Sequence, residues 1–498
     1  MTRLLVAFFT LLLFFAAPAH AVDINDQGAA KLKTMFSDML EKQKKEAEAS
    51  GSTMETEGDL AVEQADTYYA VTLPELKVLN PEGGYVKIGM VAMNVTPTEK
   101  ADEWKMSVAI PTPIIFTDKD NKEEIQINIS SQRAGGVWSE ELNNFSKLIA
   151  NYKNITFGPA GRQAVASIGQ VDILGSLTKN NENLWSGPTK FNIKDLKISG
   201  DKPNDSLSVN NVQIEASVEG FNAKKQQELV SKLQSEDGNI KSDSIILAFL
   251  ETAGQGSDFK MSINGVKAQS PKTGNVSIDT LFMNSGFSQA EKGKINTNIE
   301  FGYNGLGTTS QTSMTPKQVK FDLALKNLPI EDIIQQAITL YEPGNREGAQ
   351  RVAALQMMMT VPQMLSKSDM AILIKDTNLI SDSYQVKVAA DFAANPNSPL
   401  GFAGALNMNF DGLDETLNKL KEASVMASEE EKQKLFRSVG IFSMVQQKCP
   451  KSGSTYQCEL SLTNDGKLLL NGEDASPLLM GGMGAAMDGA SAQPPASQ

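Results

Sequence analysis

Segments in which apolar and polar residues alternate recur along most of this chain of 498 residues, and they constrain its fold more than any other feature. Residues 104–110 (WKMSVAI) and 125–129 (IQINI) are examples, and runs of Asn, Pro, Gly and Asp separate such segments. A period of two places successive side chains on opposite faces of a strand, so that one face can be buried. Many short strands separated by turns predict an antiparallel sheet.

A strand, a tight turn and an amphipathic helix follow one another three times in the second half. The three strand and helix pairs are 212–218 with 223–233, 319–325 with 330–340, and 406–410 with 415–422. One arrangement that recurs three times is hard to attribute to chance. We therefore predict an α+β fold, mostly antiparallel β, built from duplicated curved β-sheet modules that each carry an amphipathic helix.

Helices and a linker are also predicted in the first third. An apolar stripe at spacings of three and four predicts an amphipathic docking helix over residues 26–48. Residues 49–58 are rich in Ser, Gly, Thr and Glu, which predicts a linker. A further helix is expected over residues 140–152, with Ser139 as its N-cap.

These elements divide the chain into six parts. The C-terminal part consists mostly of Gly, Ala, Pro and Ser, so we expect it to be disordered. The parts are a signal peptide (1–21), an N-terminal helix and linker (22–58), an N-terminal β-rich domain (59–190), a β-rich repeat module (191–345), a second such module with a C-terminal hairpin (346–478) and the tail (479–498).

The first residues have the pattern of a cleavable signal peptide. A short basic start precedes an apolar run over residues 4–17, and Ala19-His20-Ala21 supplies the small-x-small pattern for cleavage before Val22. The apolar run is shorter than the roughly 20 residues that a spanning helix needs, and no later stretch reaches that length. We expect export to a bacterial periplasm and no transmembrane span in the mature chain.

The expected mature chain contains no histidine, because His20 is the only one. This removes the commonest general base and the usual zinc ligand. The acidic run 116–124 begins like a calcium loop but has Glu123 and Ile129 where an EF-hand needs Gly and Glu. The formal net charge of -13 argues against nucleic acid as a partner. We therefore expect no cofactor and no enzymatic activity.

The two cysteines, Cys449 and Cys458, lie nine positions apart with turn-forming residues between them. In an oxidising compartment this spacing predicts a disulfide that closes a small hairpin loop. On the chain-entropy model such a short loop contributes about 2–3 kcal/mol. The disulfide is therefore expected to hold a local turn and not the whole fold.

The apolar residues of the strands have two interpretations. They form plain cores, or, where a curved sheet keeps its concave face partly open, they line a groove for a lipid or another hydrophobic ligand. The methionines of residues 357–359 suit Cu(I), but filling of a core or groove is the favoured role. The candidate lining residues are Val319, Phe321, Leu323, Leu325, Met357, Met358, Leu406, Met408 and Phe410.

Three segments carry a resemblance to a known family. They are 326–331 (KNLPIE), 361–365 (VPQML) running into 374–379 (IKDTNL), and 464–472 (NDGKLLLNG). With them, about residues 190–478 resemble the YdgA-like family of exported bacterial envelope proteins, in which amphipathic strands end in Leu-Asp or Leu-Pro turns before a helix.

The resemblance implies an exported, β-rich protein of largely unknown function with no established catalytic residues. That family is distantly similar to AsmA-like envelope proteins, whose curved sheets are linked to lipid transport and outer-membrane homeostasis. Such proteins often keep an N-terminal membrane anchor, whereas Ala19-His20-Ala21 is of the cleavable type.

Three functions are compatible with these features. The leading one is a non-enzymatic periplasmic envelope protein that binds a lipid, another hydrophobic ligand or an envelope protein partner. A periplasmic hydrolase that uses carboxylates or a Ser-Lys pair needs no imidazole. A structural or interaction protein could instead recruit a partner by strand addition at an exposed sheet edge.

Overall fold

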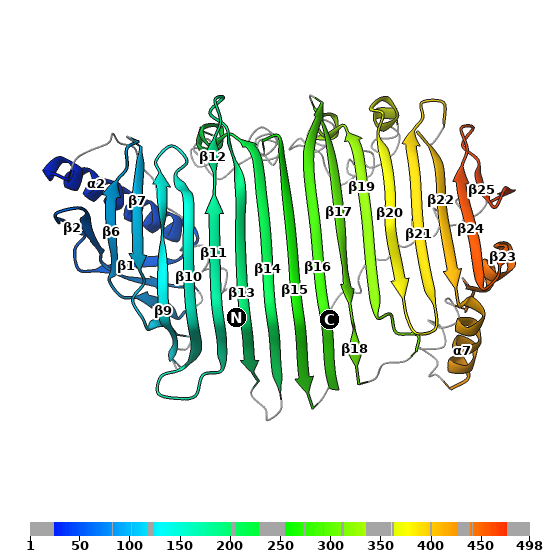
Figure 1. The fold of residues 1–498 in the computed structure, drawn as a ribbon, viewed down its shortest axis with the longest axis horizontal. Helices are drawn as coiled ribbons and strands as arrows, with labels where there is room; N and C mark the ends of the chain where they lie inside the picture. Colours follow the sequence, from blue (N-terminus) through cyan, green and yellow to red (C-terminus); the bar gives the residue numbers. More distant parts are fainter. Residues whose placement is uncertain are drawn as a thin grey trace, which may run out of the picture. The chain divides into compact units, whose positions relative to one another are not determined.

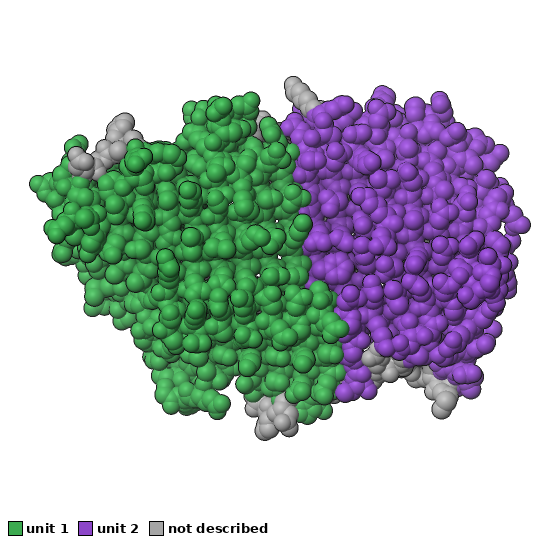
Figure 2. All heavy atoms as spheres, viewed as in Figure 1, with its two compact units in different colours: residues 1–280 green, residues 281–498 purple. Residues whose placement is uncertain are grey.

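The structure is a computed structural model, and it divides the chain into two compact units, residues 1–280 and 281–498 (Figure 2). The division falls within strand β16 (Gly274–Glu291). The residues it describes are 24–81, 83–100, 102–117, 124–200, 205–228, 254–271, 274–291, 293–309, 313–334, 360, 363–398, 401–426, 439–440 and 442–475.

Several predictions concern residues outside these ranges. They are the signal peptide with its cleavage residues Ala19, Ala21 and Val22, the candidate lining residues Met357 and Met358, and the tail 479–498. The predicted boundary at residue 345 also lies there, whereas the predicted boundary at residue 190 falls inside a strand.

Most of the residues that the structure describes in unit 1 form antiparallel β-sheet, and residues 26–49 form a long helix (Figure 1). The helix is α2 (Asp26–Ala49), and the strands are β1 (Thr53–Glu57), β2 (Ala61–Gln64), β3 (Tyr69–Leu73), β4 (Glu75–Leu79), β5 (Tyr85–Ile88), β6 (Val91–Pro97), β7 (Glu103–Ala109), β8 (Ile114–Thr117), β9 (Glu124–Ser139), β10 (Asn144–Pro159), β11 (Ala166–Ser176), β12 (Thr178–Lys179), β13 (Trp185–Ser199), β14 (Ser206–Phe221) and β15 (Gly256–Ser270).

The sheet of unit 1 divides into two branches at β9. The first half of β9 pairs with β8, which continues through β5 and β4 to β1, and the second half pairs with β7, which continues through β6 and β3 to β2. At the division the side-chain amide of Gln132 accepts from the backbone N of Ile110 at 2.9 Å and donates to its carbonyl at 2.6 Å. The backbone N–H and carbonyl of Ile110, which pair with neither branch, thereby obtain hydrogen-bond partners.

On its other side, β9 pairs along its length with β10, and the sheet continues through β11, β13 and β14 to β15. These long strands lie side by side in Figure 1. The predicted antiparallel sheet is therefore confirmed, and its longest strands carry the alternation that predicted it.

Helix α2 begins where the sequence predicts it and packs on the branched part of the sheet. The Asn25 side chain caps it by accepting from the backbone N of Gly28 at 2.9 Å, and Tyr69 of β3 contacts the backbone of Asn25. Leu32 and Phe36 are fully buried against the branch that contains β3, β6 and β7. The amphipathic stripe of the sequence thus docks on its own unit.

Two predictions in this part of the chain are wrong. The predicted linker 49–58 contains β1, which pairs with β4 and buries Met54. Residues 140–143 form a turn, and 144–159 form β10 instead of the helix predicted over 140–152. Leu148, Ala150 and Tyr152 alternate with polar or exposed residues, so the period of two and the two neighbouring strands decide the structure.

Unit 2 has the same antiparallel character. Its elements are β17 (Lys294–Asn304), β18 (Gly307–Thr308), β19 (Gln318–Leu328), β20 (Ala371–Ile380), β21 (Gln385–Ala394), β22 (Phe402–Asp411), helix α7 (Leu413–Met426), β23 (Lys451–Ser452), β24 (Thr455–Leu462), β25 (Leu468–Leu470) and β26 (Glu473–Asp474). The order of the main strands is β17, β19, β20, β21, β22, β24 and β25.

The predicted strand and helix pairs correspond to elements of the structure. Helical residues follow β14 at 223–228 and β19 at 330–334, where the described segments end, and α7 follows β22. Cys449 and Cys458 form the predicted disulfide, which joins the helical residues 442–448 to β24. Among the described residues, no helix is both long and apolar enough to cross a membrane.

Candidate functional site

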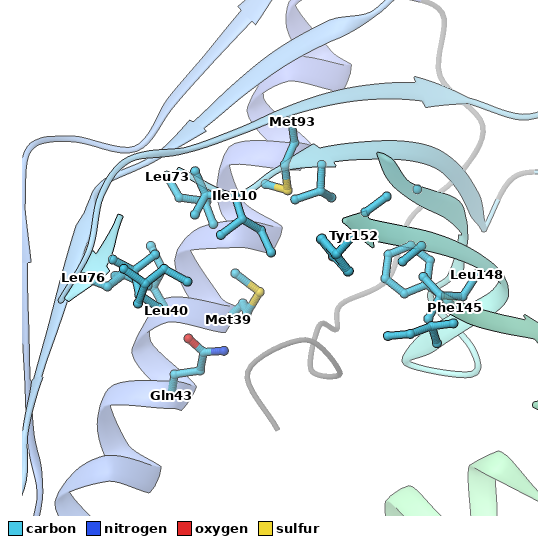
Figure 3. Close-up of a pocket in the computed structure, with 18 residues that line it drawn as sticks. Met39, Leu40, Gln43, Leu73, Leu76, Met93, Ile110, Phe145, Leu148 and Tyr152 are labelled. Carbon is cyan, nitrogen blue, oxygen red and sulfur yellow. The ribbon is translucent and has the colours of Figure 1, made fainter. Parts of the chain in front are cut away.

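An apolar pocket lies beneath the middle of α2, where the two branches of the unit 1 sheet separate (Figure 3). It encloses about 110 Å³, enough for several water molecules or a short length of hydrocarbon chain. The lining residues are Met39, Leu40, Gln43, Leu73, Leu76, Ile88, Val91, Met93, Val108, Ile110, Ile114, Ala134, Gly135, Phe145, Leu148, Ala150, Tyr152 and Ile173.

The periods of the elements place these side chains in the pocket. On α2, Met39 and Gln43 are four residues apart and therefore lie on one face of the helix. On β10, Leu148, Ala150 and Tyr152 are two residues apart and share one face of the sheet. Helix and sheet thus contribute opposite walls.

Tyr152 places a hydroxyl group in these apolar surroundings. The residue is 5% exposed, and its hydroxyl forms no hydrogen bond with the residues that the structure describes. Burial raises the pKa of Tyr152 to about 12, so the group stays protonated and can donate. The side-chain amide of Gln43, on the opposite wall, likewise has no hydrogen-bond partner within the described part of the chain.

The apolar surface continues from the pocket across the sheet. Ile173 of β11 lines the pocket, and its register neighbours on the next three strands are Phe191, Ile214 and Met261. Residues in register on neighbouring strands point to the same face. These three residues are only half-buried, so the apolar row stays partly accessible beyond the cover of α2.

The opposite face of the same strands is charged. Next to the apolar row, Leu174 is followed in register by Lys190, Glu215 and Lys260, all of which are exposed. Lys190 and Glu215 form an ion pair at 2.8 Å. The two faces therefore differ sharply: one suits water and the other suits a hydrophobic ligand.

In unit 2 the candidate lining residues also share one face. Val319, Phe321, Leu323 and Leu325 alternate along β19 and are half-buried. Register then connects Leu323 through β20 and β21 to Leu406 of β22. The structure therefore brings the candidates of β19 and β22 onto one sheet face, three strands apart.

Phe410 differs from the other candidates on β22. It is 1% exposed and packs in the C-terminal core with Leu413 and Phe442. Its ring is therefore closed off by other side chains.

Leu406 and Met408 instead line a hollow of about 310 Å³ in unit 2. Val445 and the disulfide cysteines bound it on the side of the helical residues 442–448, and Leu460, Leu468 and Leu470 extend it along β24 and β25. The disulfide therefore holds one wall of this hollow in place.

In comparison with known proteins, the chain matches no family model and no curated protein. Among the residues that the structure describes, no group of three or more His, Cys, Asp or Glu could hold a metal ion. The described lining of the pocket under α2 is apolar apart from Gln43 and Tyr152.

A buried charge cluster fixes α2 beside the pocket. The carboxylate of Glu140, at the end of β9, accepts from Trp104 Nε1 at 2.7 Å and lies 3.3 Å from Lys31 Nζ. Burial lowers the pKa of Lys31, and the charge of Glu140 opposes that shift. Glu140 is buried whereas Lys31 is partly exposed, so removal of Lys31 would take this cation from a buried carboxylate. The cluster therefore favours a docked helix.

Unit 2 contains one contact of the kind that a Ser-Lys hydrolase would use. Lys419 Nζ lies 2.7 Å from Ser383 Oγ and 2.9 Å from Ser313 Oγ, but it also forms an ion pair with Glu415 at 2.6 Å. A general base must be free to take the proton of the serine hydroxyl, whereas three oxygen partners already engage Lys419 Nζ. Ser383 is itself buried. The contact therefore fits a role in fixing α7 better than a role in catalysis.

Sequence reasoning did not identify the pocket or Tyr152. Residues 140–152 were predicted as a helix, which hides the common orientation of Leu148, Ala150 and Tyr152. The alternation of these three residues was the available signal. The sequence contains no comparable signal for the position of α2 over the branch point. That contact depends on pairing between strands that are far apart in the sequence.

Proposed function

We propose that this chain is a non-enzymatic, exported protein of the bacterial envelope, of the YdgA-like type, which binds a lipid or another hydrophobic ligand along the apolar face of its sheet. The resemblance of residues 190–478 and the signal-peptide pattern support export and a periplasmic location. Helical residues follow each of the strands β14, β19 and β22, and this recurring arrangement supports an origin by duplication of one module.

One observation carries the binding proposal: a half-buried apolar row runs in register from the pocket under α2 across three further strands. Phe191, Ile214 and Met261 extend the pocket wall that ends at Ile173. A contiguous apolar surface that stays accessible is uncommon on a protein without a partner for it. A hydrocarbon chain on this row would bury that surface and displace water from it.

Native mass spectrometry with solvent extraction tests the proposal on residues 22–498 purified from a bacterial periplasm without detergent. We expect a reproducible co-purifying lipid or an added mass on the protein. The variant Ile214→Glu places a charge in the middle of the apolar row and should abolish that added mass, because a carboxylate is costly to cover with hydrocarbon.

Gln213→Glu is the matched control. Gln213 is the exposed neighbour of Ile214 on the same strand and points to the charged face, so this variant should keep the lipid. A clean ligand-free mass for the unmodified chain, or equal lipid content in both variants, would contradict binding on this face. Thermal unfolding of both variants shows whether lipid loss reflects misfolding.

A further inference from the structure

The hydroxyl of Tyr152, in the apolar lining of the pocket, points to the chemical class of the ligand. We infer that the pocket under α2 takes an uncharged chain that carries an oxygen acceptor, such as an ester carbonyl, and that Tyr152 donates a hydrogen bond to it. This inference rests on the proposed function and assigns Tyr152 as the residue that distinguishes an ester from a plain hydrocarbon.

The first step is the state of the hydroxyl. Tyr152 is 95% buried, since 5% of it is exposed, and it lines the pocket without a hydrogen-bond partner among the described residues. The buried side-chain atoms without a partner in the described part of the chain do not include the hydroxyl oxygen of Tyr152, so this oxygen keeps accessible surface and is free to donate to water or to a ligand. Figure 3 shows Tyr152 among the pocket side chains, and the labelled side chains of Ile110, Leu148 and Phe145 carry no hydrogen-bond acceptor.

The second step is the charge of the ligand. None of the described residues that line the pocket is charged, so an ionised carboxylate there would have no cation to compensate its burial. A neutral carbonyl oxygen needs only a donor, which Tyr152 supplies. The amide of Gln43, which also lines the pocket, is uncharged and therefore does not supply such a cation either.

The third step is the space for the rest of the chain. From β10 the apolar row crosses β11, β13 and β14 to β15, which is four strand spacings or roughly 19 Å. One leaflet of a bilayer core is about 15 Å thick, which is the length of one layer of acyl chains. Ile173 is in register with Ala150, which is two residues from Tyr152 on the same face of β10. A chain whose ester is held at Tyr152 would therefore pass Ala150 and then follow Ile173, Phe191, Ile214 and Met261.

Two probes of equal size test this inference: methyl dodecanoate, which has an ester, and pentadecane, which has none. Their affinities are measured by displacement of the fluorescent dye N-phenyl-1-naphthylamine from the mature chain and from the variant Tyr152→Phe. We expect Tyr152→Phe to lower the affinity for methyl dodecanoate about two- to tenfold, the effect of one hydrogen bond. The affinity for pentadecane should stay the same or rise, because pentadecane covers the hydroxyl without accepting from it. For each probe, the affinity of the variant is compared with that of the unmodified chain. This ratio is independent of the difference in water solubility between the two probes.

Tyr85→Phe is the matched control, because Tyr85 lies on β5 next to Lys77 on the charged face and should change neither affinity. The shift in the midpoint of thermal unfolding with each probe provides a second readout. If Tyr152→Phe lowers the affinity for both probes equally, or for neither, the role of Tyr152 is overturned while hydrophobic binding stands. Failure of both probes to displace the dye from the unmodified chain would overturn the proposed function as well.

Discussion

Replacing Leu32 with Ala tests whether α2 is an integral part of unit 1. Leu32 is fully buried in a cluster with Phe36, Tyr69 and Trp104. A buried Leu→Ala change loses the transfer free energy of the removed methyl groups and leaves a cavity, which together cost about 3–5 kcal/mol. We expect the low end of that range if the neighbouring side chains relax into the space.

Urea unfolding followed by tryptophan fluorescence measures this loss. All three tryptophans of the chain lie in unit 1, and Trp104 and Trp138 belong to the cluster under α2. With a slope of about 3 kcal/mol per M, the urea midpoint of Leu32→Ala should fall by roughly 1 M or more. The exposed neighbour Lys33 provides the control, since Lys33→Ala should change stability by less than about 0.5 kcal/mol. Equal midpoints for the two variants would refute the docking of α2 on its own unit.

Two further predictions concern unit 2. Hydrogen bonds from Lys451, Tyr456 and Gln446 lower the pKa of Asp414 from 3.8 to about 2, so its stabilisation is complete above about pH 4 and is lost as the pH falls toward 2. Asp414→Asn should remove this part of the acid dependence in thermal unfolding at pH 2 to 5, and an unchanged profile would contradict the assignment. Removal of the disulfide in Cys449→Ala with Cys458→Ala should lower the stability of unit 2 by about 2–3 kcal/mol in calorimetry. The tryptophan-detected unfolding of unit 1 should not change.

The local elements could be predicted from the sequence because each has its own period. The stripe with Leu32 and Phe36 predicted α2, and the alternation of residues 319–325 and 406–410 predicted β19 and β22. The disulfide was predictable because nine residues separate two cysteines. All of these signals are local, so they need no knowledge of the partner strand.

The pocket could not be predicted in the same way, because it depends on pairing between distant segments. β9 pairs with β8 over its first half and with β7 over its second half, and nothing in the alternation of β9 marks the change of partner. In the sequence, Gln132 cannot be distinguished from other polar strand residues. In the structure its side chain bonds the backbone of Ile110 at the point where the branches separate. A strand pattern fixes which face a side chain occupies, but the register fixes its neighbours.

The branch point also explains why the apolar face of unit 1 is covered in one part and partly exposed in another. Over the branches, α2 supplies Leu32, Phe36 and Met39, and the sheet face is closed into a core. Along β13 to β15 the same alternation continues, yet Phe191 and Ile214 stay half-buried. A sequence with a period of two that served only core packing would become more polar where the cover ends, since apolar side chains that stay partly exposed there favour association. The persistence of apolar residues along this row therefore supports the proposal that a hydrocarbon chain contacts this face.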